Sequence, residues 1–461
     1  MTLHSPLGNS RAQRDIAFHV HSQTDLRAHE AQGPHVITQG DGVFVIDEDG
    51  NRHLEAMAGL WNVALGFSEA RLAKAAADQM AKLPYYHTFY HKTADVTIDL
   101  AEKLVGMAPE GLTKAYFVNS GSEANDSAVK LVWYLNHARG RPEKRKIIGR
   151  KRGFHGVTGL SASMTGIARM HTDFGLPLPG FLHVTCPHLY RDGLPGETEA
   201  AFADRLAAEL DALIQAEGPE TVAAFVAEPV MGAGGVVVPP AGYFPKIQAV
   251  LRKHDVLFIA DEVICGLGRT GNMWGSQTFD IQPDLLTSSK ALSSGYMPIA
   301  AVLMREEIYQ EVADHSARLG GFGHGYTGSG HPTACAVALE TLKIIEERDL
   351  VAHVRQVGPR LLDGLHRFAD HPLVGEVRGV GLIAAVELVA DKATRAPFPP
   401  TRKLGARVQE IAQDERLIVR ALGDSIAFTP PLIISAEEID ELLARLSRSL
   451  DRTLAEVEAA A

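Results

Sequence analysis

The chain has 461 residues, 46% of them hydrophobic and 22% charged, which is ordinary for a globular protein and predicts two or three lobes rather than one simple core. Its formal net charge of -11 at pH 7 argues against nucleic-acid binding, because that function needs a basic surface. No apolar run has the length of a membrane span and no signal-peptide layout opens the sequence, so we expect no membrane partner and a cytoplasmic location.

The N-terminal part of the chain combines a polar stretch with a hairpin. His4, His19 and His21 lie in the polar stretch, which we interpret as an arm draped over the protein rather than as a set of metal ligands. The segment from Gly42 to Leu54 has apolar runs on both sides of an Asp-Gly turn, and this pattern predicts a β-hairpin.

The middle of the chain, from about residue 65 to 335, alternates strands with amphipathic helices. This is the pattern of an α/β domain with a mostly parallel sheet. Its clearest helix spans residues 197–217, where apolar residues recur at helical spacing before a Gly-Pro stop. The three cysteines are too far apart for a disulfide framework or a zinc site, so we expect reduced, buried thiols and no metal at Cys186, Cys265 and Cys335.

The C-terminal part is predicted to contain both strands and helices. Residues 377–388 and 417–434 have the character of strands, residues 401–415 and 436–458 that of helices, and the proline-rich residues 396–400 that of a surface loop. We therefore predict an α/β fold in which a large domain at 65–335 carries a mostly parallel sheet. A smaller α+β domain is built from both termini: residues 1–64 supply an arm and part of it, and residues 336–461 supply the rest.

A turn of small residues, 119–122 (NSGS), follows a predicted strand at 115–118 and precedes a predicted helix from Glu123 to about His137. Backbone N–H groups at a helix N-terminus bind phosphate well, and small residues allow it to approach closely. Serine-rich helix caps are also common without any ligand. The turn has no Walker or Rossmann glycine pattern, which weakens a nucleotide interpretation.

Two apolar runs end in residues that can carry chemistry. The strand-like run 256–261 ends in Asp261, and a second run beginning at residue 284 ends at Lys290. In doubly wound sheets ligands collect outside the carboxyl ends of the strands, so this acid and this amine can converge on one site. Pyridoxal phosphate needs such a pair: a lysine that holds its aldehyde as a Schiff base, and a carboxylate that keeps the ring nitrogen protonated. Taken alone, either residue is better explained as a solvated lysine or an ordinary helix-capping acid.

Nine blocks, in order, carry a resemblance that covers roughly residues 35–450. The sequence resembles class III aminotransferases, especially the amine and ω-amino acid:pyruvate transaminases. The blocks are 58–61 (AGLW), 119–126 (NSGSEAND), 153–156 (GFHG), 227–229 (AEP), 232–235 (GAGG), 261–271 (DEVICGLGRTG), 289–290 (SK), 325–332 (GYTGSGHP) and 420–424 (RALGD).

The resemblance implies a fold-type-I enzyme with pyridoxal 5'-phosphate as cofactor. Lys290 and Asp261 would be the catalytic pair, with Lys290 moving a proton between the substrate and the cofactor in a 1,3-shift. Desolvation would have to lower the pKa of this lysine. The cofactor-binding residues carried over from the family are Gly121, Ser122, Phe154, His155, Glu228, Asp261, Val263, Lys290 and Thr327. The substrate-binding residues are Trp61, Phe89, Phe154, Ala233 and Arg420.

Phe154 is a departure from the family, which usually has a tyrosine in this block. Stacking on the cofactor is retained, but the hydroxyl near the lysine is lost. One hydrogen bond changes binding by about 0.5–1.5 kcal/mol, so the reaction class should not change. Plain core packing is the alternative for the aromatic residues and for Val263.

Two further family residues suggest how the site is completed. Thr327 matches a threonine that reaches the phosphate in the neighbouring subunit, which implies a homodimer or higher assembly with shared active sites. Its glycine-rich loop, 320–330, could equally be a flexible surface loop. Arg420 stands in an otherwise apolar strand, where an arginine is costly unless it meets an anion, and it matches the family's mobile arginine. A structural ion pair with a surface acid is the alternative.

These features predict a transaminase that moves an amino group from a primary amine, diamine or ω-amino acid to pyruvate or a similar keto acid. An aminomutase or decarboxylase of the same fold would share Lys290 and Asp261. A cofactor-binding protein without catalysis is disfavoured because Glu228 and Arg420 are present as well as Lys290 and Asp261. A nicotinamide-dependent oxidoreductase is disfavoured by the missing glycine fingerprint. The sequence leaves open the physiological donor, the preferred enantiomer, the choice between dimer and tetramer, and the kinetic effect of Phe154.

Overall fold

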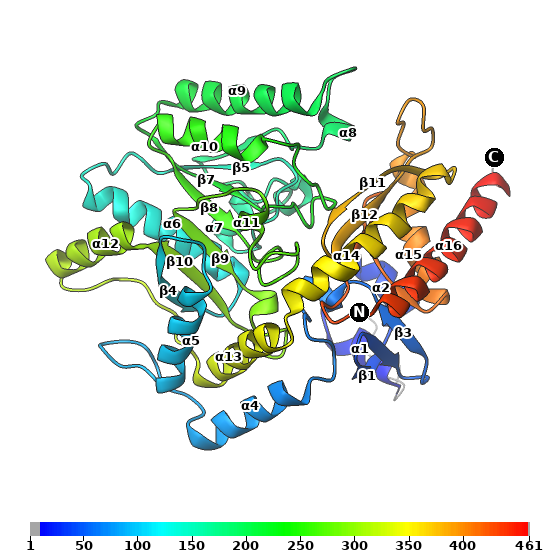
Figure 1. The fold of residues 1–461 in the computed structure, drawn as a ribbon, viewed down its shortest axis with the longest axis horizontal. Coiled ribbons are helices and arrows are strands. Elements are labelled where there is room, and N and C mark those ends of the chain that lie inside the picture. Colours follow the sequence, from blue (N-terminus) through cyan, green and yellow to red (C-terminus); the bar gives the residue numbers. More distant parts are fainter. Residues whose placement is uncertain (1–9, 460–461) are drawn as a thin grey trace, which may run out of the picture.

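The computed structural model describes residues 10–459, so His4 lies outside the described residues (Figure 1). No helix in this part of the chain is long and apolar enough to cross a membrane. All three cysteines are buried and unpaired, as predicted. The cytoplasmic location stays a prediction.

A mixed, mostly parallel sheet forms the centre of the large lobe. Its seven strands run in the order β4-β10-β9-β8-β7-β5-β6, with bounds Leu112–Val118 (β4), Ala300–Arg305 (β10), Leu285–Ser288 (β9), Leu257–Asp261 (β8), Val222–Ala227 (β7), Lys146–Arg150 (β5) and Phe181–Val184 (β6). Only β10 runs antiparallel to its neighbours β4 and β9, and the pairs from β9 to β6 are parallel. The predicted α/β class is confirmed.

Helices cover both faces of this sheet, which explains why the central strand β7 is apolar and buried along its whole length. In β7, Ala224 and Val226 face the core shared with α6, whereas Phe225 and Ala227 face the core shared with α9 and α10. The helices of this lobe are α4 (Ala70–Lys82), α5 (Asp95–Gly106), α6 (Gly121–Ala138), α7 (Gly159–Met164), α8 (Leu189–Asp192), α9 (Glu199–Glu217), α10 (Tyr243–Lys253), α11 (Gly275–Thr278), α12 (Glu306–Leu319) and α13 (Pro332–Glu347).

Both ends of the chain build the second lobe. Its strands form two four-stranded sheets: β1 (Ile37–Asp41), β2 (Phe44–Asp47), β3 (Arg52–Glu55) and β13 (Leu417–Ile418), and β11 (Val374–Val380), β12 (Ile383–Leu388), β15 (Ser425–Phe428) and β14 (Arg420–Leu422). The remaining helices are α1 (Arg11–Phe18), α2 (Leu26–Gln32), α3 (Ala58–Trp61), α14 (Leu350–His366), α15 (Leu404–Asp414) and α16 (Ala436–Ala459), with 3-10 turns at Ala168–Met170, Lys290–Leu292, Arg367–Asp370 and Pro400–Arg402.

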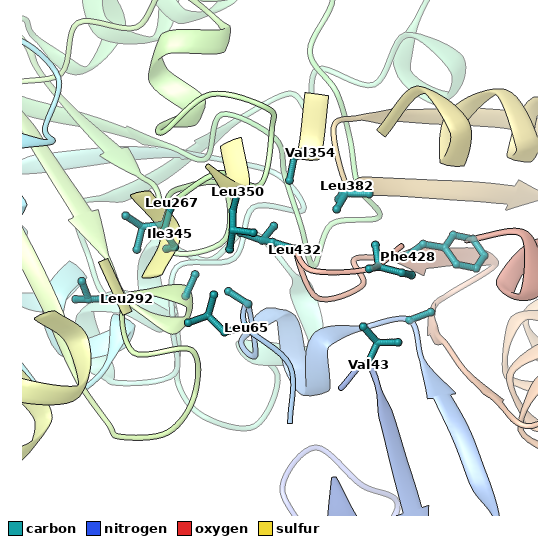
Figure 2. Packing of buried hydrophobic residues seen from close by; sticks show 14 of the residues in the cluster. Val43, Leu65, Leu267, Leu292, Ile345, Leu350, Val354, Leu382, Phe428 and Leu432 are labelled. Carbon is teal, nitrogen blue, oxygen red and sulfur yellow. The ribbon is translucent and has the colours of Figure 1, made fainter. Parts of the chain in front are cut away.

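One hydrophobic core joins the two lobes. Figure 2 shows Val43 from the N-terminal hairpin, Leu350 from α14 and Leu432 from the C-terminal segment in the same cluster as Leu292, beside the central sheet. The predicted boundary at 335/336 falls within α13, which packs on α4 and α5. The division into domains therefore stays a prediction.

The predicted strands differ from the structure mainly where the chain passes from one sheet to another or turns back on itself. The predicted strand 417–434 is three short strands, because β13 pairs with β3 and the chain then crosses to pair β14 with β15. The predicted strand 377–388 is the hairpin β11–β12. Gly381 turns this hairpin at φ 58, and a Cβ there would come within 2.6 Å of the Arg269 carbonyl oxygen. The polar arm contains α1 and α2, which the sequence did not predict.

We expect Phe225→Ala to lower the apparent free energy of unfolding by about 3–5 kcal/mol, because this ring fills the core between β7 and the helices α9 and α10. Phe225 is 0% exposed. The matched control Phe18→Ala removes a ring that is 77% exposed and should change that free energy by less than about 0.5 kcal/mol. Urea unfolding followed by tryptophan fluorescence measures both, and equal losses would contradict the assigned core.

Candidate active site

The candidate site is a cavity of about 340 Å³ at the edge of the sheet where its parallel strands end. Each of its main residues follows the end of a strand. Phe154 and His155 come after β5, Glu228 comes after β7, and Asp261 is the last residue of β8. The complete lining is Asn62, Asn119, Ser120, Gly121, Ser122, Asn125, Phe154, His155, Gly156, Glu228, Asp261, Val263, Ile264, Ser289, Lys290, Ser293, Gly295, Met297, Pro298 and Ile299.

Asp261 is a buried carboxylate held by donors from three parts of the fold. Its Oδ2 accepts the Asn125 amide at 2.8 Å and lies 2.8 Å from His155 Nδ1, and its Oδ1 accepts the Val263 N–H at 3.1 Å. Asn125 is fixed in turn, because its Oδ1 accepts the Thr287 hydroxyl of β9 at 3.1 Å. These hydrogen bonds satisfy both carboxylate oxygens and fix the position of the side chain at the end of the strand.

Lys290 extends into the same cavity from the 3-10 turn that follows β9. Its backbone is left-handed, with φ 46, a conformation that is uncommon outside glycine and costs about 1–3 kcal/mol when imposed. Burial lowers the pKa of its amine to about 8, against the attraction of the Asp261 and Glu228 carboxylates. The amine is thus easier to deprotonate near neutral pH than that of an exposed lysine.

The N-terminus of α6 supplies an anion-binding surface to the cavity. This helix begins two residues earlier than predicted, at Gly121, because Ser120 is the N-cap and accepts the Glu123 N–H at 3.2 Å. Opposite it, Gly156 has φ 137, and a Cβ there would come within 2.5 Å of Ser122 Oγ. Small residues therefore keep this end open to a phosphate group, toward which the N–H groups of Gly121 and Ser122 and the helix dipole are favourable.

Glu228 connects two walls of the site. Its Oε1 accepts the Phe154 N–H at 3.1 Å and its Oε2 accepts the Gly232 N–H at 2.9 Å. Burial raises the pKa of this carboxyl. The structure thus gives Glu228 a positioning role: it fixes the backbone beside the Phe154 ring and the start of the glycine-rich segment 232–235.

Two arginines hold that glycine-rich segment from the other side. Arg152 donates to the Gly234 carbonyl at 2.7 Å, and Arg378 of β11 donates to the Gly235 and Val236 carbonyls at 3.0 and 3.1 Å. Arg378 is itself neutralised by Glu376 and Glu387. The C-terminal lobe thereby sets the position of the segment that carries Ala233.

The structure brings together some of the predicted residues and leaves others apart. Gly121, Ser122, Phe154, His155, Glu228, Asp261, Val263 and Lys290 line the cavity, whereas Trp61, Phe89, Ala233, Thr327 and Arg420 do not. Trp61 is buried in the cluster that contains Ile264, a cavity residue. Phe89 lies in a separate hollow along the segment Gly320–Gly325, and Thr327 is exposed.

Sequence reasoning missed the role of Asn125, the amide that binds Asp261. Asn125 lies within the block 119–126, but only the fold shows that its position on α6, one turn after Gly121, directs its side chain to the end of β8. Ser289 and Asn62 also line the cavity without having been predicted. No spacing signal identifies them, because serines and asparagines are common in turns.

The residues present fit pyridoxal phosphate. Asp261 contacts α6 through Asn125, roughly one turn or about 5 Å beyond the N–H groups of Gly121 and Ser122. At this spacing the acid could meet the protonated ring nitrogen of the cofactor while the N-terminus of α6 meets its phosphate, which a short arm joins to the ring. Lys290 supplies the amine, and Phe154 and Val263 supply apolar surface in the same cavity.

The comparisons with known proteins agree with this site. The aminotransferase class-III family matches residues 27–450. The gamma-aminobutyrate transaminase 1 of rice (Oryza sativa subsp. indica), described as mitochondrial, is 51% identical over 91% of this chain and 82% of its own length. The corresponding tomato (Solanum lycopersicum) protein is 50% identical over 92% of this chain and 83% of its own.

Solved structures show the same architecture. The omega transaminase from Pseudomonas jessenii in complex with PMP has a TM-score of 0.96 and is 56% identical over 97% of this chain and 99% of its own. A thermostable omega transaminase variant engineered for the synthesis of enantiopure bulky amines has the same TM-score and identity, over 97% of this chain and 100% of its own. The chain therefore belongs to the class-III aminotransferases, the pyridoxal phosphate-dependent transaminases.

Proposed function

We propose that the protein transfers the amino group of a primary amine, diamine or ω-amino acid, γ-aminobutyrate among them, to pyruvate or a similar small keto acid. The observation that carries this proposal is the state of Arg420. It is half-buried on β14, and among residues 10–459 its side chain forms no ion pair or hydrogen bond. The alternative of a structural ion pair finds no support in this part of the chain.

A half-buried guanidinium without a protein anion is suited to an anionic ligand. Burial and the positive charge of Arg169 lower the pKa of Arg420, so both make its charged form less favourable. A bound carboxylate would compensate for this cost. The charge of Arg420 also lowers the pKa of Lys290, which indicates that the two cations act on one region. Guanidinium pairs with carboxylate in a bidentate manner, as recognition of a keto acid or an ω-amino acid requires.

The apolar walls of the cavity suit the rest of the donor. Phe154, Val263 and Ile264 line the cavity with side chains that have neither a hydroxyl nor a charge. At position 154 the family usually has a tyrosine, whose hydroxyl is missing here. The names of the relatives point the same way, since the curated relatives are gamma-aminobutyrate transaminases and the structural neighbours are omega transaminases. The cavity and the relatives therefore support a class of donor, and the donor itself has to be found by experiment.

In the reaction the protein's own residues bind, orient and move protons. When bound, pyridoxal phosphate supplies an aldehyde that takes up the amino group and a ring that accepts electrons. The Asp261 carboxylate would stabilise a protonated ring nitrogen, and the N-terminus of helix α6 would bind the phosphate. The Lys290 Nζ would take the proton from the carbon that bears the donor's amino group. It would then deliver this proton to the cofactor carbon that has received the amino group.

A homodimer with shared sites is part of the same proposal. Thr327 is exposed and does not line the cavity of its own chain. Its backbone is nevertheless fixed, because the Tyr85 hydroxyl donates to the Thr327 carbonyl at 2.8 Å. A fixed, exposed threonine is available to the site of a second copy, as the family resemblance implies.

The function is tested by incubating the enzyme with a panel of donors and pyruvate, and measuring alanine. We expect alanine to form in step with loss of γ-aminobutyrate, other ω-amino acids or alkyl amines. Donor loss without alanine would favour an aminomutase or decarboxylase, and loss of neither would contradict the proposal.

Arg420→Ala should raise the KM for pyruvate about ten- to a hundredfold, the size expected when a charge-assisted bond of about 1.5–3 kcal/mol is removed. The half-reaction with a plain alkyl amine should be nearly unchanged, because this donor has no carboxylate. Stopped-flow absorbance resolves the two half-reactions. Arg402→Ala, which alters an exposed arginine in the 3-10 turn before α15, is the control. Equal damage to both half-reactions would exclude a selective carboxylate role.

Asp261→Asn should lower the rate of the donor half-reaction by at least about a hundredfold, because the neutral amide no longer stabilises the ring cation. The fold should persist, since an asparagine has nearly the same volume and its one side-chain oxygen can still accept from either the Val263 N–H or the Asn125 amide. Asp363→Asn on the surface of α14 is the control. Near-normal turnover of Asp261→Asn would show that another group holds the ring proton.

The shared site predicts complementation between two inactive variants. Lys290→Ala lacks the amine, and Thr327→Asp places a negative charge against the phosphate. In a heterodimer of these chains one site keeps both native residues if Thr327 acts across the interface, so co-expression should restore up to about a quarter of wild-type activity. If Thr327 acts within its own chain, neither site is intact and no activity returns. Sedimentation equilibrium should show at least a dimer for each variant.

A further inference from the structure

The two helices of the N-terminal arm are held with little burial of their side chains. Helix α1 has eight residues and α2 seven, and neither contains a buried residue. Helices this short are unstable alone in water, and most helical stability comes from packing an apolar face. Capping by Ser10 and Asp25 helps each helix but does not join the two. Another interaction has to fasten them together.

The carboxylate of Asp15 lies where the two helices meet and is surrounded by imidazoles. His19 Nδ1 lies 3.0 Å from its Oδ1, and His21 Nε2 and His29 Nε2 lie 2.8 and 3.0 Å from its Oδ2. The rings are close together, with centroids 4.5 Å apart for His19 and His21 and 4.0 Å for His21 and His29.

The spacing explains why the four side chains converge. Asp15 and His19 are four residues apart, at one face of α1 and its C-cap. His21 follows as the chain turns, and His29 returns from α2. The side chain of His29 is only 9% exposed and that of Asp15 21% exposed, so the centre of the cluster is shielded although the arm lies at the surface.

We propose that Asp15, His19, His21 and His29 form a binding site for Zn²⁺ or a similar divalent transition metal that fastens α1 to α2. Three imidazoles and one carboxylate are a donor set that zinc prefers, and four ligands complete its tetrahedral shell. The ligand atoms of Asp15, His19 and His21 all lie within 4.8 Å of one another. His29 Nε2 lies 3.0 Å from Asp15 Oδ2 and would shift toward the metal to complete the shell. Metal binding requires each imidazole to be neutral, with its proton on the ring nitrogen that faces away from the metal and its lone pair directed at the metal.

Two other groups of histidines and carboxylates are less suited to a metal. At His188, Glu376 and Glu387, the guanidinium of Arg378 already neutralises both carboxylates. At His35, Asp47 and His53, Asp47 is engaged by the backbone N–H groups of Asp49 and Asn51 in the hairpin turn. Within residues 10–459, Asp15 has only imidazoles as ion-pair partners.

The location suggests why the arm is fastened. Gln23, in the turn between α1 and α2, accepts the Arg169 side chain at 3.3 Å. Arg169 in turn lowers the pKa of Arg420 through its positive charge. The metal site therefore orders the segment that holds a cation beside the substrate arginine.

The test uses untagged holoenzyme, stripped with EDTA and desalted, then titrated with ZnCl₂ by calorimetry and dialysed for metal analysis. We expect one zinc per chain for the wild type and for the control His366→Ala, which alters an exposed histidine of α14. The double variant His21→Ala/His29→Ala should bind at least about tenfold more weakly. Its absorbance from bound cofactor and its thermal midpoint report whether the rest of the fold is intact.

Limited trypsin digestion gives a second measure that does not depend on activity. Zinc should slow cleavage after Arg14 and Arg27 in the wild type and leave the double variant unaffected. Retention of zinc by the double variant at wild-type affinity would place the metal elsewhere. Absence of any bound zinc after dialysis would show that hydrogen bonds to Asp15 alone hold the arm, and either result would overturn the proposal.

Discussion

The carboxylate of Asp261 is the constraint on which the arrangement of the site depends. A charged group buried without partners is very unfavourable, so its three donors must stay in place for the fold to be stable. They come from α6, from the segment after β5 and from the end of β8 itself. Since Asn125 also bonds to Thr287 of β9 and to the His155 carbonyl, these elements cannot move independently. The acid thus orders the walls of the cavity as well as contributing to the chemistry.

The position of Lys290 after a strand end, and its strained backbone, explain why it can serve as a base. The amine is placed by a left-handed backbone between β9 and the following turn, and burial supplies the depressed pKa. Strain of this kind persists only where the surroundings fix it. The same surroundings include the well-packed apolar strands β8 and β9, so the stability of the sheet core maintains the reactivity of a residue outside it.

The sequence predicted the architecture and the centre of the site better than its periphery. Parallel strands covered on both faces leave long apolar runs, so residues 256–261 and 284–290 already indicated where the acid and the amine would meet. Residues 417–434 were harder, because the chain exchanges one sheet for another there and no local pattern marks the change. Asn125 was missed since its role depends on which strand end faces α6. Trp61, Phe89 and Thr327 came from family resemblance alone, and the cavity of one chain does not include them.

The pairing of β3 with β13 has a consequence for how the protein is made. Leu54 is in parallel register with Leu417, so the first sheet stays incomplete until the last part of the chain has been synthesised. At ribosomal rates of about 5–20 residues per second, this delay is on the order of tens of seconds. Throughout that time the exposed edge of β3 and the apolar face of the N-terminal hairpin lack their covering, which makes the nascent chain a substrate for chaperones. A truncation that removes β13 would thus leave the edge of β3, near the N-terminus, permanently unpaired.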